Sequence, residues 1–221
     1  MTKSERPKLI YVAQRHPRYT HEAFIQRWRQ HAAVGMSQPR WRNVARYLHC
    51  DRIDALPEAV PPLDCDGVAV VVYRSESARQ AHIADESARR TMKQDELDTF
   101  AQPVANTSLL VSEDLARSGP VDGFRLFVFW PAGSPDGALA VCDNVLDVPE
   151  VGWTRNHPAG RIGSWECARV DELIAATIEP LCALATRFGN ALHAARAQDD
   201  ELSRHPPRLV LTHTVVLHDV P

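Results

Sequence analysis

The residues best suited to move a proton lie in the segment HEAFIQRWRQHAAVG, residues 21–35. Phe24, Trp28 and His31 recur at helical spacing, so on an α-helix they fall on one face. Thr20 precedes the segment where a helix N-cap is expected. Histidine titrates at about pH 6.5 and can take up and return a proton at neutral pH. We therefore predict that His31 is a catalytic residue beside Trp28; the structural alternative is a histidine that binds the terminal carbonyl groups of its helix.

Tyr47 and His49 form a second group of candidates in the segment RYLHC. They alternate along a predicted strand, so both side chains project from the same face, about 7 Å apart. A phenol and an imidazole in this arrangement could orient a substrate carbonyl group or supply a second proton-transfer group. The alternative is that both are ordinary residues at the rim of a strand. We predict that Tyr47 and His49 are catalytic together with His31.

Further residues are predicted to contact the substrate. Arg15 could pair with an anionic group, and Asp66 could either hold a histidine in one tautomer or belong to a turn. The strand 67–73 has one face with small side chains, which favours a cavity wall over a packed core. His213 lies among apolar residues, where a structural role is the alternative. The full set of predicted substrate-binding residues is Tyr11, Arg15, Trp28, Asp66, Tyr73, His157 and His213.

The elements that must position these residues follow from the apolar pattern. In the first half we predict strands over 8–15, 42–50, 66–75 and 106–115, a helix over 21–35 and a helical region broken near Asp85. After a linker at 116–123 we predict strands over 124–131, 151–160, 163–171 and 208–218, a short helix within 137–146 and a helix over 171–197, kinked or restarted at Pro180. Each half reads β-α-β-β-α-β, the ferredoxin-like order.

The predicted fold class is therefore α+β, with two tandem ferredoxin-like units at residues 1–118 and 119–221. Such a unit covers one face of its sheet with helices and leaves the other face bare. Two units can place sheet against sheet and enclose a cavity, which is a favoured place for a small ligand. We expect this cavity to be largely apolar, with His31, His49 and Tyr47 reaching into it.

An ordered set of short segments resembles the EthD family of dimeric α+β-barrel proteins. The segments are FIQRWRQHAAV, RYLH, CDGVAVVVY and QDELDTF, all within residues 8–115. Residues 122–221 contain no comparable motif and are assigned to a diverged second copy on architecture alone. The resemblance implies a barrel of the dimeric type built as a pseudo-dimer, a single active site, and chemistry without metal, haem or flavin. Members of the family with assigned chemistry resemble lyases that dehydrate or decarboxylate aromatic or polyketide-like compounds, while others are linked only to degradation pathways. The resemblance therefore implies an enzyme for a small, largely apolar substrate and does not identify the reaction.

Composition limits the other classes of function. The net charge is −3 across 221 residues, and no concentrated basic run suggests nucleic acid as a partner. No apolar run is long enough to span a membrane, so we expect a cytoplasmic protein. The five cysteines are odd in number and form no CxxC motif, which indicates reduced structural thiols. Serine hydrolase, P-loop and dinucleotide-binding motifs are absent from the sequence.

We therefore predict a cofactor-independent lyase that acts on a small aromatic or hydrophobic compound, with a homodimer as a possible assembly. His31 would remove a proton next to a carbonyl group or phenol, and His49 or Tyr47 would stabilise the enolate or protonate the leaving group. Two alternatives stay open. One is a cofactor-free monooxygenase of phenolic substrates, and the other is a non-catalytic carrier or sensor of a hydrophobic metabolite.

Overall fold

The computed structural model describes residues 2–3, 6–58, 60–160, 162–197 and 200–220. The first half contains β1 (Thr2–Lys3), β2 (Lys8–Ala13), α1 (His21–Met36), the 3₁₀ helix η1 (Pro39–Asn43), β3 (Val44–Arg52), β4 (Gly67–Tyr73), α2 (Glu76–Ala84), α3 (Glu86–Thr99), the 3₁₀ helix η2 (Val104–Thr107) and β5 (Ser108–Arg117). The second half contains β6 (Gly123–Pro131), α4 (Asp136–Leu146), β7 (Gly152–Gly160), β8 (Cys167–Ala175), α5 (Glu179–Arg196), α6 (Asp200–Arg204) and β9 (Arg208–Asp219).

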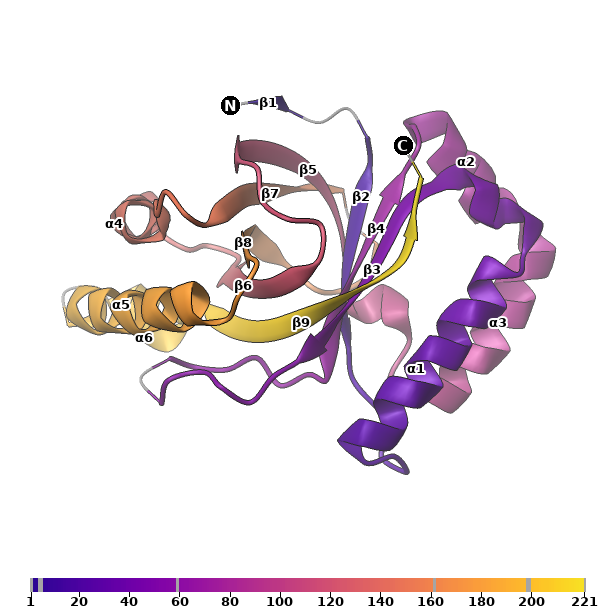
Figure 1. Ribbon diagram of the computed structural model, residues 1–221, viewed down its shortest axis with the longest axis horizontal. Coiled ribbons are helices and arrows are strands. Elements are labelled where there is room, and N and C mark those ends of the chain that lie inside the picture. The colour runs from indigo at the N-terminus through magenta and orange to yellow at the C-terminus, as the bar shows by residue number, and fades with distance from the viewer. Residues whose placement is uncertain (1, 4–5, 59, 161, 198–199, 221) are drawn as a thin grey trace.

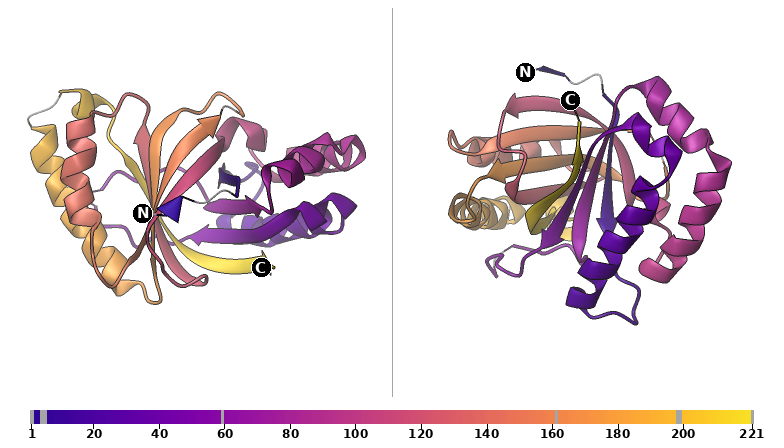
Figure 2. Two further views of the ribbon diagram at one scale, coloured as in Figure 1. Left: turned by 90° about the horizontal axis from the view of Figure 1, so that it is seen from above. Right: turned by 45° about the vertical axis from the view of Figure 1, so that its right-hand side comes forward.

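Eight strands, β2 to β9, close into one antiparallel barrel within the described chain. The strand order is β5-β2-β4-β3-β9-β6-β8-β7, and β7 pairs back onto β5. The two seams, β3–β9 and β5–β7, each join a strand of the first half to a strand of the second. Helices α1, α2 and α3 lie on one side of the barrel, and α4, α5 and α6 lie on the other (Figures 1 and 2). The fold is therefore α+β, built around a closed antiparallel barrel.

Most of the elements expected from the sequence are present, including the break at Asp85. This residue ends α2, and its Oδ1 accepts a hydrogen bond from the backbone N–H of Ala88 as the N-cap of α3, at 3.0 Å. The predicted helix over 171–197 was wrong at its start, because residues 171–175 belong to strand β8. Helix α5 begins at Glu179, with Pro180 in the first turn, where a missing N–H costs nothing.

Three apolar clusters stabilise the fold, and the alternation along the strands divides them. On β2, Ile10 and Val12 point into the barrel, while Tyr11 and Ala13 point outward toward α1. The barrel interior is packed by residues that include Leu48, Cys50, Val68, Val70, Phe127, Phe129, Val170 and Val210. A third cluster lies between the barrel and helices α4 and α5. Both faces of the sheet are therefore buried.

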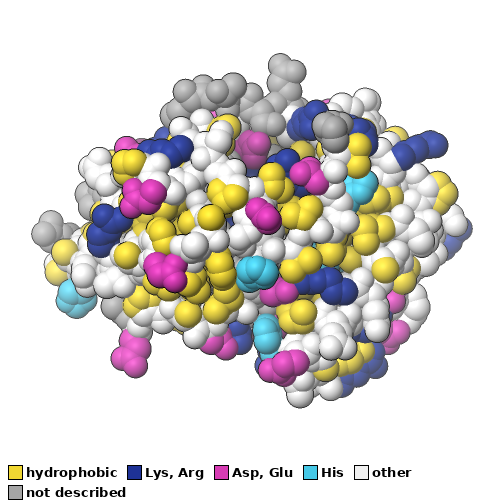
Figure 3. All heavy atoms as spheres, in the orientation of Figure 1, with side chains coloured by type: hydrophobic (Ala, Val, Ile, Leu, Met, Phe, Trp, Pro, Cys, Tyr) yellow, Lys and Arg dark blue, Asp and Glu magenta, His cyan; other side chains and the backbone are white. Residues whose placement is uncertain are grey.

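The surface carries charges of both signs. On the face seen in Figure 3, acidic and basic side chains are interspersed rather than sorted into separate patches. Among the described residues, no helix combines the length and the apolar character needed to cross a membrane.

A candidate active site between the barrel and its helices

Helix α1 presents the predicted stripe to the outer face of the barrel. Its N-cap is Thr20, whose hydroxyl accepts a hydrogen bond from the backbone N–H of Ala23 at 3.3 Å. The buried face contains Phe24, Trp28 and His31, so the spacing of these residues was interpreted correctly. The Phe24 and Trp28 rings stack with their centroids 5.7 Å apart. The stripe therefore anchors α1 on the sheet and buries the imidazole that follows it.

His31 is paired with a carboxylate on the neighbouring helix. Its Nδ1 lies 2.6 Å from Oδ2 of Asp95 on α3, and the other oxygen of Asp95 accepts a hydrogen bond from Arg27 at 2.5 Å. Because the carboxylate can only accept, the proton of a neutral His31 sits on Nδ1. The lone pair on Nε2 is then left free, since no described residue binds that nitrogen. This is the arrangement in which a carboxylate orients a general base.

The ionisation of this pair fits such a role. Burial lowers the pKa of His31 below 6.5, although Asp95 opposes the shift. Burial alone would raise the pKa of Asp95, but hydrogen bonds from Arg27 and His31 lower it. At neutral pH the imidazole is therefore in its basic form and the carboxylate is charged. A neutral base with a charged orienting partner can accept a proton and be stabilised as it does so.

A chain of hydrogen bonds runs beside this pair through the other predicted catalytic residues. Arg29 contacts Nδ1 of His49, and because a guanidinium only donates, that nitrogen accepts. The proton of His49 is therefore on Nε2, which donates to the Tyr47 hydroxyl at 2.6 Å. The Tyr47 and Tyr11 hydroxyls are 3.0 Å apart, and Trp28 Nε1 donates to the Tyr11 hydroxyl at 3.1 Å.

Counting hydrogens along this chain leaves one without an acceptor. The Tyr47 and Tyr11 hydroxyls each carry one hydrogen, and a single hydrogen bond joins them. The incoming N–H groups of His49 and Trp28 are donors and cannot accept the second hydrogen. Among the described residues, one phenolic O–H therefore has no acceptor. The buried pair of tyrosines can offer that hydrogen to a bound molecule.

The members of the chain stay neutral at physiological pH. Burial, reinforced by Arg29, lowers the pKa of His49 well below 6.5. Burial also raises the pKa of Tyr47 well above 10 and that of Tyr11 to about 12. Both ring nitrogens of His49 are engaged, so the imidazole serves as a link that orients Tyr47. Arg29 is in turn held by Asp51 at 2.5 Å.

The expected location of these side chains was wrong. Tyr11, Tyr47 and His49 point away from the barrel interior and toward α1, so they do not line a cavity between the two sheets. The small residues of β4 make room for Trp28 rather than for a ligand. A Cβ atom on Gly67 would lie 2.7 Å from Cζ3 of Trp28, whose ring stacks on His49 at a centroid distance of 3.7 Å.

Arg15 and Asp66 pair with each other and not with an open cavity. Their side chains form an ion pair, and the backbone N–H of Arg15 donates to Asp66 Oδ2 at 2.8 Å. Asp66 also lies 3.0 Å from Nδ1 of His21, so it does hold a histidine, but one that the sequence did not single out. Tyr73 is buried edge-on against His82, at a centroid distance of 5.4 Å.

His157 and His213 lie apart from the residues around Trp28. His157 on β7 is 44% exposed and sits 3.4 Å from Asp114. His213 on β9 is exposed and packs edge-on against Phe124, at a centroid distance of 5.2 Å. The structure therefore brings together Tyr11, Trp28, His31, Tyr47 and His49 but not these two histidines.

Three residues of the site were missed in the sequence. These residues are Asp95, Arg27 and Arg29, which were not among the predicted site residues. Each has its partner on another element, and Asp95 is 64 residues from His31. A charged residue next to an apolar stripe was the available signal, although it does not identify a partner. Within the described part of the chain, no three His, Cys, Asp or Glu side chains converge as metal ligands.

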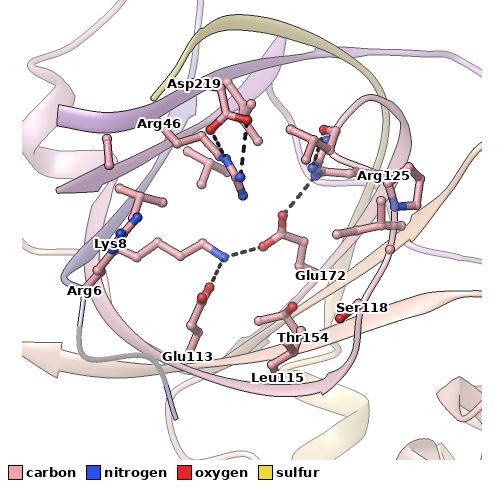
Figure 4. A pocket seen from close by; sticks show the side chains of 18 of the residues that line it. Arg6, Lys8, Arg46, Glu113, Leu115, Ser118, Arg125, Thr154, Glu172 and Asp219 are labelled. Carbon is pink, nitrogen blue, oxygen red and sulfur yellow. Dashed lines mark hydrogen bonds and ion pairs between the residues drawn. The ribbon is translucent and has the colours of Figure 1, made fainter. Parts of the chain in front are cut away.

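The barrel interior differs from the apolar chamber that we expected. Its middle is packed with side chains, and one end opens into a cavity of about 520 Å³. Lys8 projects into this end between Glu113, at 2.9 Å, and Glu172, at 2.6 Å (Figure 4). Arg125 donates to the other oxygen of Glu172 at 3.0 Å. The cavity is therefore charged, and its lining contains neither His31 nor the tyrosine pair.

A comparison with protein families finds a match over one segment in the first half of the chain. The model of the EthD domain matches residues 16–103, which contain α1 to α3 and the His31–Asp95 pair. The match places most of the candidate site within a segment that is similar to the EthD domain. The match stops before β5, so the second half lies outside the EthD domain model. Among curated proteins, none matches the sequence.

Several solved structures share the fold at low sequence identity. One is a protein from Fusobacterium nucleatum subsp. nucleatum named "Putative monooxygenase", with a TM-score of 0.54 and 9% identity, covering 98% of this chain and 99% of that one. An anthrone oxidase-like protein has a TM-score of 0.52 and 13% identity, covering 96% and 94%. A chlorite dismutase variant from Candidatus Nitrospira defluvii has a TM-score of 0.51 and 10% identity, covering 96% and 92%. These similarities show that the whole chain shares the α+β barrel fold of these proteins.

Proposed function

We propose that this EthD-domain protein is a cofactor-independent lyase that acts on a small aromatic or hydrophobic compound, with His31 as the general base. The observation that carries the proposal is the His31–Asp95 pair. Oδ2 of Asp95 lies 2.6 Å from Nδ1 of His31 and accepts its proton in a hydrogen bond, which leaves Nε2 as the proton acceptor. Removal of a proton next to a carbonyl group or phenol is the first step of dehydration and of related eliminations.

The tyrosine pair supplies the second group in this proposal. As Nε2 of His31 removes a proton, negative charge develops on the substrate oxygen. The spare O–H of Tyr11 and Tyr47 then donates a hydrogen bond to that oxygen. His49 and Arg29 are positioning residues, because they fix the direction in which the Tyr47 hydroxyl points.

The surroundings of His31 support an aromatic or apolar substrate. Phe100 packs edge-on against both His31 and Tyr11, at centroid distances of 5.0 and 6.3 Å. The His31 side chain is 9% exposed, so the substrate must displace a neighbouring side chain to reach Nε2. Phe100 directly follows α3, and we propose that its ring moves aside and that the substrate takes its place between the base and the phenols.

The test is a panel of hydroxylated and carboxylated aromatic compounds incubated without oxygen, with loss of water or carbon dioxide followed by mass spectrometry. The variant His31→Ala should lower turnover by at least about 10²-fold and leave the fold intact. His213→Ala is the matched control, because that exposed histidine lies apart from the site. Unchanged turnover in His31→Ala would refute the role of His31. Binding without conversion in both proteins would instead indicate a carrier or sensor.

A cofactor-free monooxygenase of phenols is the second candidate. Its support is that two of the structurally similar proteins are named as a monooxygenase and as anthrone oxidase-like. The same base would deprotonate the phenol, and a ring carbon of the resulting phenolate, which has carbanion character, would add O₂. Loss of water from the hydroperoxide would leave a quinone that keeps one of the two oxygen atoms. Product that forms only in the presence of oxygen, with one atom of oxygen from labelled O₂ incorporated, would favour this candidate over the lyase.

We further propose that the chain consists of two ferredoxin-like units in tandem, at residues 1–118 and 119–221. The support is the strand order, which follows the same rule in both halves. The first half has its fourth, first, third and second barrel strands side by side as β5-β2-β4-β3, and the second half repeats this as β9-β6-β8-β7. Only the first half carries the histidine and the tyrosines, so one active site is proposed.

A further inference from the structure

The charged cavity at the end of the barrel is separate from the site around His31. It lies on the inner face of β2, β3 and β4, whereas Tyr11, Tyr47 and His49 project from the outer face of β2 and β3. Four basic and three acidic side chains line it, together with apolar residues such as Leu48, Val70, Val72 and Ile174. Its volume of about 520 Å³ is within the range of small-molecule sites.

Lys8 is the most deeply buried cation in this cavity and has an N–H to spare. Its side chain is 5% exposed, and Nζ donates to Glu113 and Glu172. An ammonium group carries three N–H donors, so the third has no acceptor among the described residues. Both oxygens of Glu172 are already occupied, by Lys8 and by Arg125. A molecule bound in the cavity can therefore supply an acceptor for the third N–H.

Arg46 and Thr154 add further unused donors. Arg46 binds Asp219 through Nε and Nη2, at 2.9 and 3.3 Å, which occupies both carboxylate oxygens and leaves Nη1 without a protein partner in the described chain. Its guanidinium group points toward the centre of the cavity (Figure 4). Thr154, which is 5% exposed, also lines the cavity, and its hydroxyl has no acceptor in the part of the chain that the structure describes.

Three donor groups at this end of the barrel thus lack a hydrogen-bond partner among the described residues: one N–H of Lys8 Nζ, Nη1 of Arg46 and the Thr154 hydroxyl. Among the carboxylates that bind Lys8, Arg125 and Arg46, Oε1 of Glu113 is the oxygen that receives no hydrogen bond from a described residue. We infer that the cavity binds a small organic carboxylate with a compact apolar body. The carboxylate accepts hydrogen bonds from Lys8 Nζ, Arg46 Nη1 and the Thr154 hydroxyl, and the apolar body packs on Leu48, Val70 and Ile174.

The fixed charges around the ligand persist across the physiological range. Burial would raise the pKa of Glu172, but Lys8 and Arg125 lower it to about 2. Burial would lower the pKa of Lys8, but Glu172 and Glu113 raise it. Binding should therefore depend on the charge of the ligand rather than on the charge of the site.

The test measures benzoate binding to the full chain by isothermal titration calorimetry, with benzamide as the neutral analogue of the same shape. Benzoate should bind at least about tenfold more tightly than benzamide. Arg46→Gln should weaken benzoate binding about tenfold, and Thr154→Val should weaken it by about threefold, because each removes one donor. Arg18→Gln is the matched control, since Arg18 pairs with Asp98 at the surface outside the cavity. His31→Ala should bind benzoate as the unmodified chain does.

Several results would overturn the inference. These are the absence of saturable benzoate binding, equal affinity for benzamide, or unchanged affinity in both Arg46→Gln and Thr154→Val. Loss of benzoate binding in His31→Ala would place the ligand at the other site. Displacement of benzoate by an equal concentration of inorganic phosphate would show that the cavity binds a more highly charged anion in preference to a carboxylate. Arg46 is partly exposed and Val matches the shape of Thr, so both variants should fold.

Discussion

The Nδ1 atom of His31 on α1 lies 2.6 Å from Oδ2 of Asp95 on α3, and 64 residues of chain separate the two. Packing of the two helices over the outer face of the barrel brings the pair together. The carboxylate fixes the tautomer of the imidazole and would stabilise its protonated form. A buried histidine without such a partner would resist protonation more strongly, because burial alone lowers its pKa.

The first prediction concerns Asp95→Asn. Because Asp95 raises the pKa of His31 through its hydrogen bond and charge, the variant should lower that pKa further. Turnover should fall by about tenfold or more, because the imidazolium formed in the reaction loses its counter-charge. The measurement is an NMR titration of the His31 ring beside the activity assay. Asp98→Asn, on the same helix, is the control, and equal effects in the two variants would contradict the prediction.

The second prediction concerns the effect of pH on stability. Burial, reinforced by Arg40, lowers the pKa of His82 to about 4, and burial lowers those of His31 and His49 as well. In the unfolded chain these histidines bind protons at about pH 6.5, so the unfolded state takes up more protons as the pH falls. The free energy of unfolding should therefore decrease below about pH 6.5, by up to about 1.4 kcal/mol per pH unit for each histidine.

Urea denaturation of the unmodified chain and of His82→Asn between pH 7 and pH 5 tests this sign. The variant should lose less stability per pH unit than the unmodified chain, because one buried neutral histidine is gone. A stability that rises on acidification, or an identical slope in both proteins, would refute the assignment.

The third prediction compares two buried tyrosines. Tyr47→Phe removes the acceptor for Nε2 of His49 and leaves that N–H buried without a partner. The variant should lower the free energy of unfolding by about 1–3 kcal/mol. Tyr73→Phe should change it by less than about 0.5 kcal/mol, since no described residue forms a hydrogen bond with the Tyr73 hydroxyl. Similar losses in the two variants, measured by urea denaturation, would argue against the hydrogen-bond chain.

The fourth prediction concerns Gly67. An added Cβ would lie 2.7 Å from both the backbone oxygen of Cys50 and Cζ3 of Trp28, so the ring would be forced off its stacked position on His49. Gly67→Ala should therefore lower the free energy of unfolding by about 1–3 kcal/mol. Gly160→Ala is the control, because its Cβ would meet the Leu110 side chain at an ordinary 3.7 Å. A melting temperature lowered equally in both variants would contradict the steric explanation.

The sequence predicted most of the elements but not the direction of their faces. Alternation along β2 and β4 correctly separates Tyr11 from Ile10 and Ala69 from Val70. It does not show which set faces the barrel interior, because both faces are buried and apolar. The small residues of β4 suggested open space, whereas they accommodate the indole of Trp28.

The polar contacts were harder to predict from the sequence, because their partners are far apart in the chain. Lys8 meets Glu172 across 164 residues, and Arg125 meets Glu172 across 47. In the sequence alone, a charged residue within an apolar strand resembles part of a weak strand or of a helix. For this reason residues 171–175, which belong to β8, were predicted as the start of the helix over 171–197. The stripe of Phe24, Trp28 and His31 on α1 could be predicted because these residues are close together in the sequence. Asp95, the partner of His31, could not be predicted because it is 64 residues away.

At the two seams of the barrel, each half protects the strand edges of the other half from aggregation. Each seam covers one open backbone edge of each half, and bare edges of this kind recruit other molecules into aggregates. A chain severed between β5 and β6 would yield two fragments that stay soluble when they are produced together and precipitate when they are produced apart. Under the proposed function, in which the first half carries the active site, the second half is still required, because it covers the exposed edges of the first.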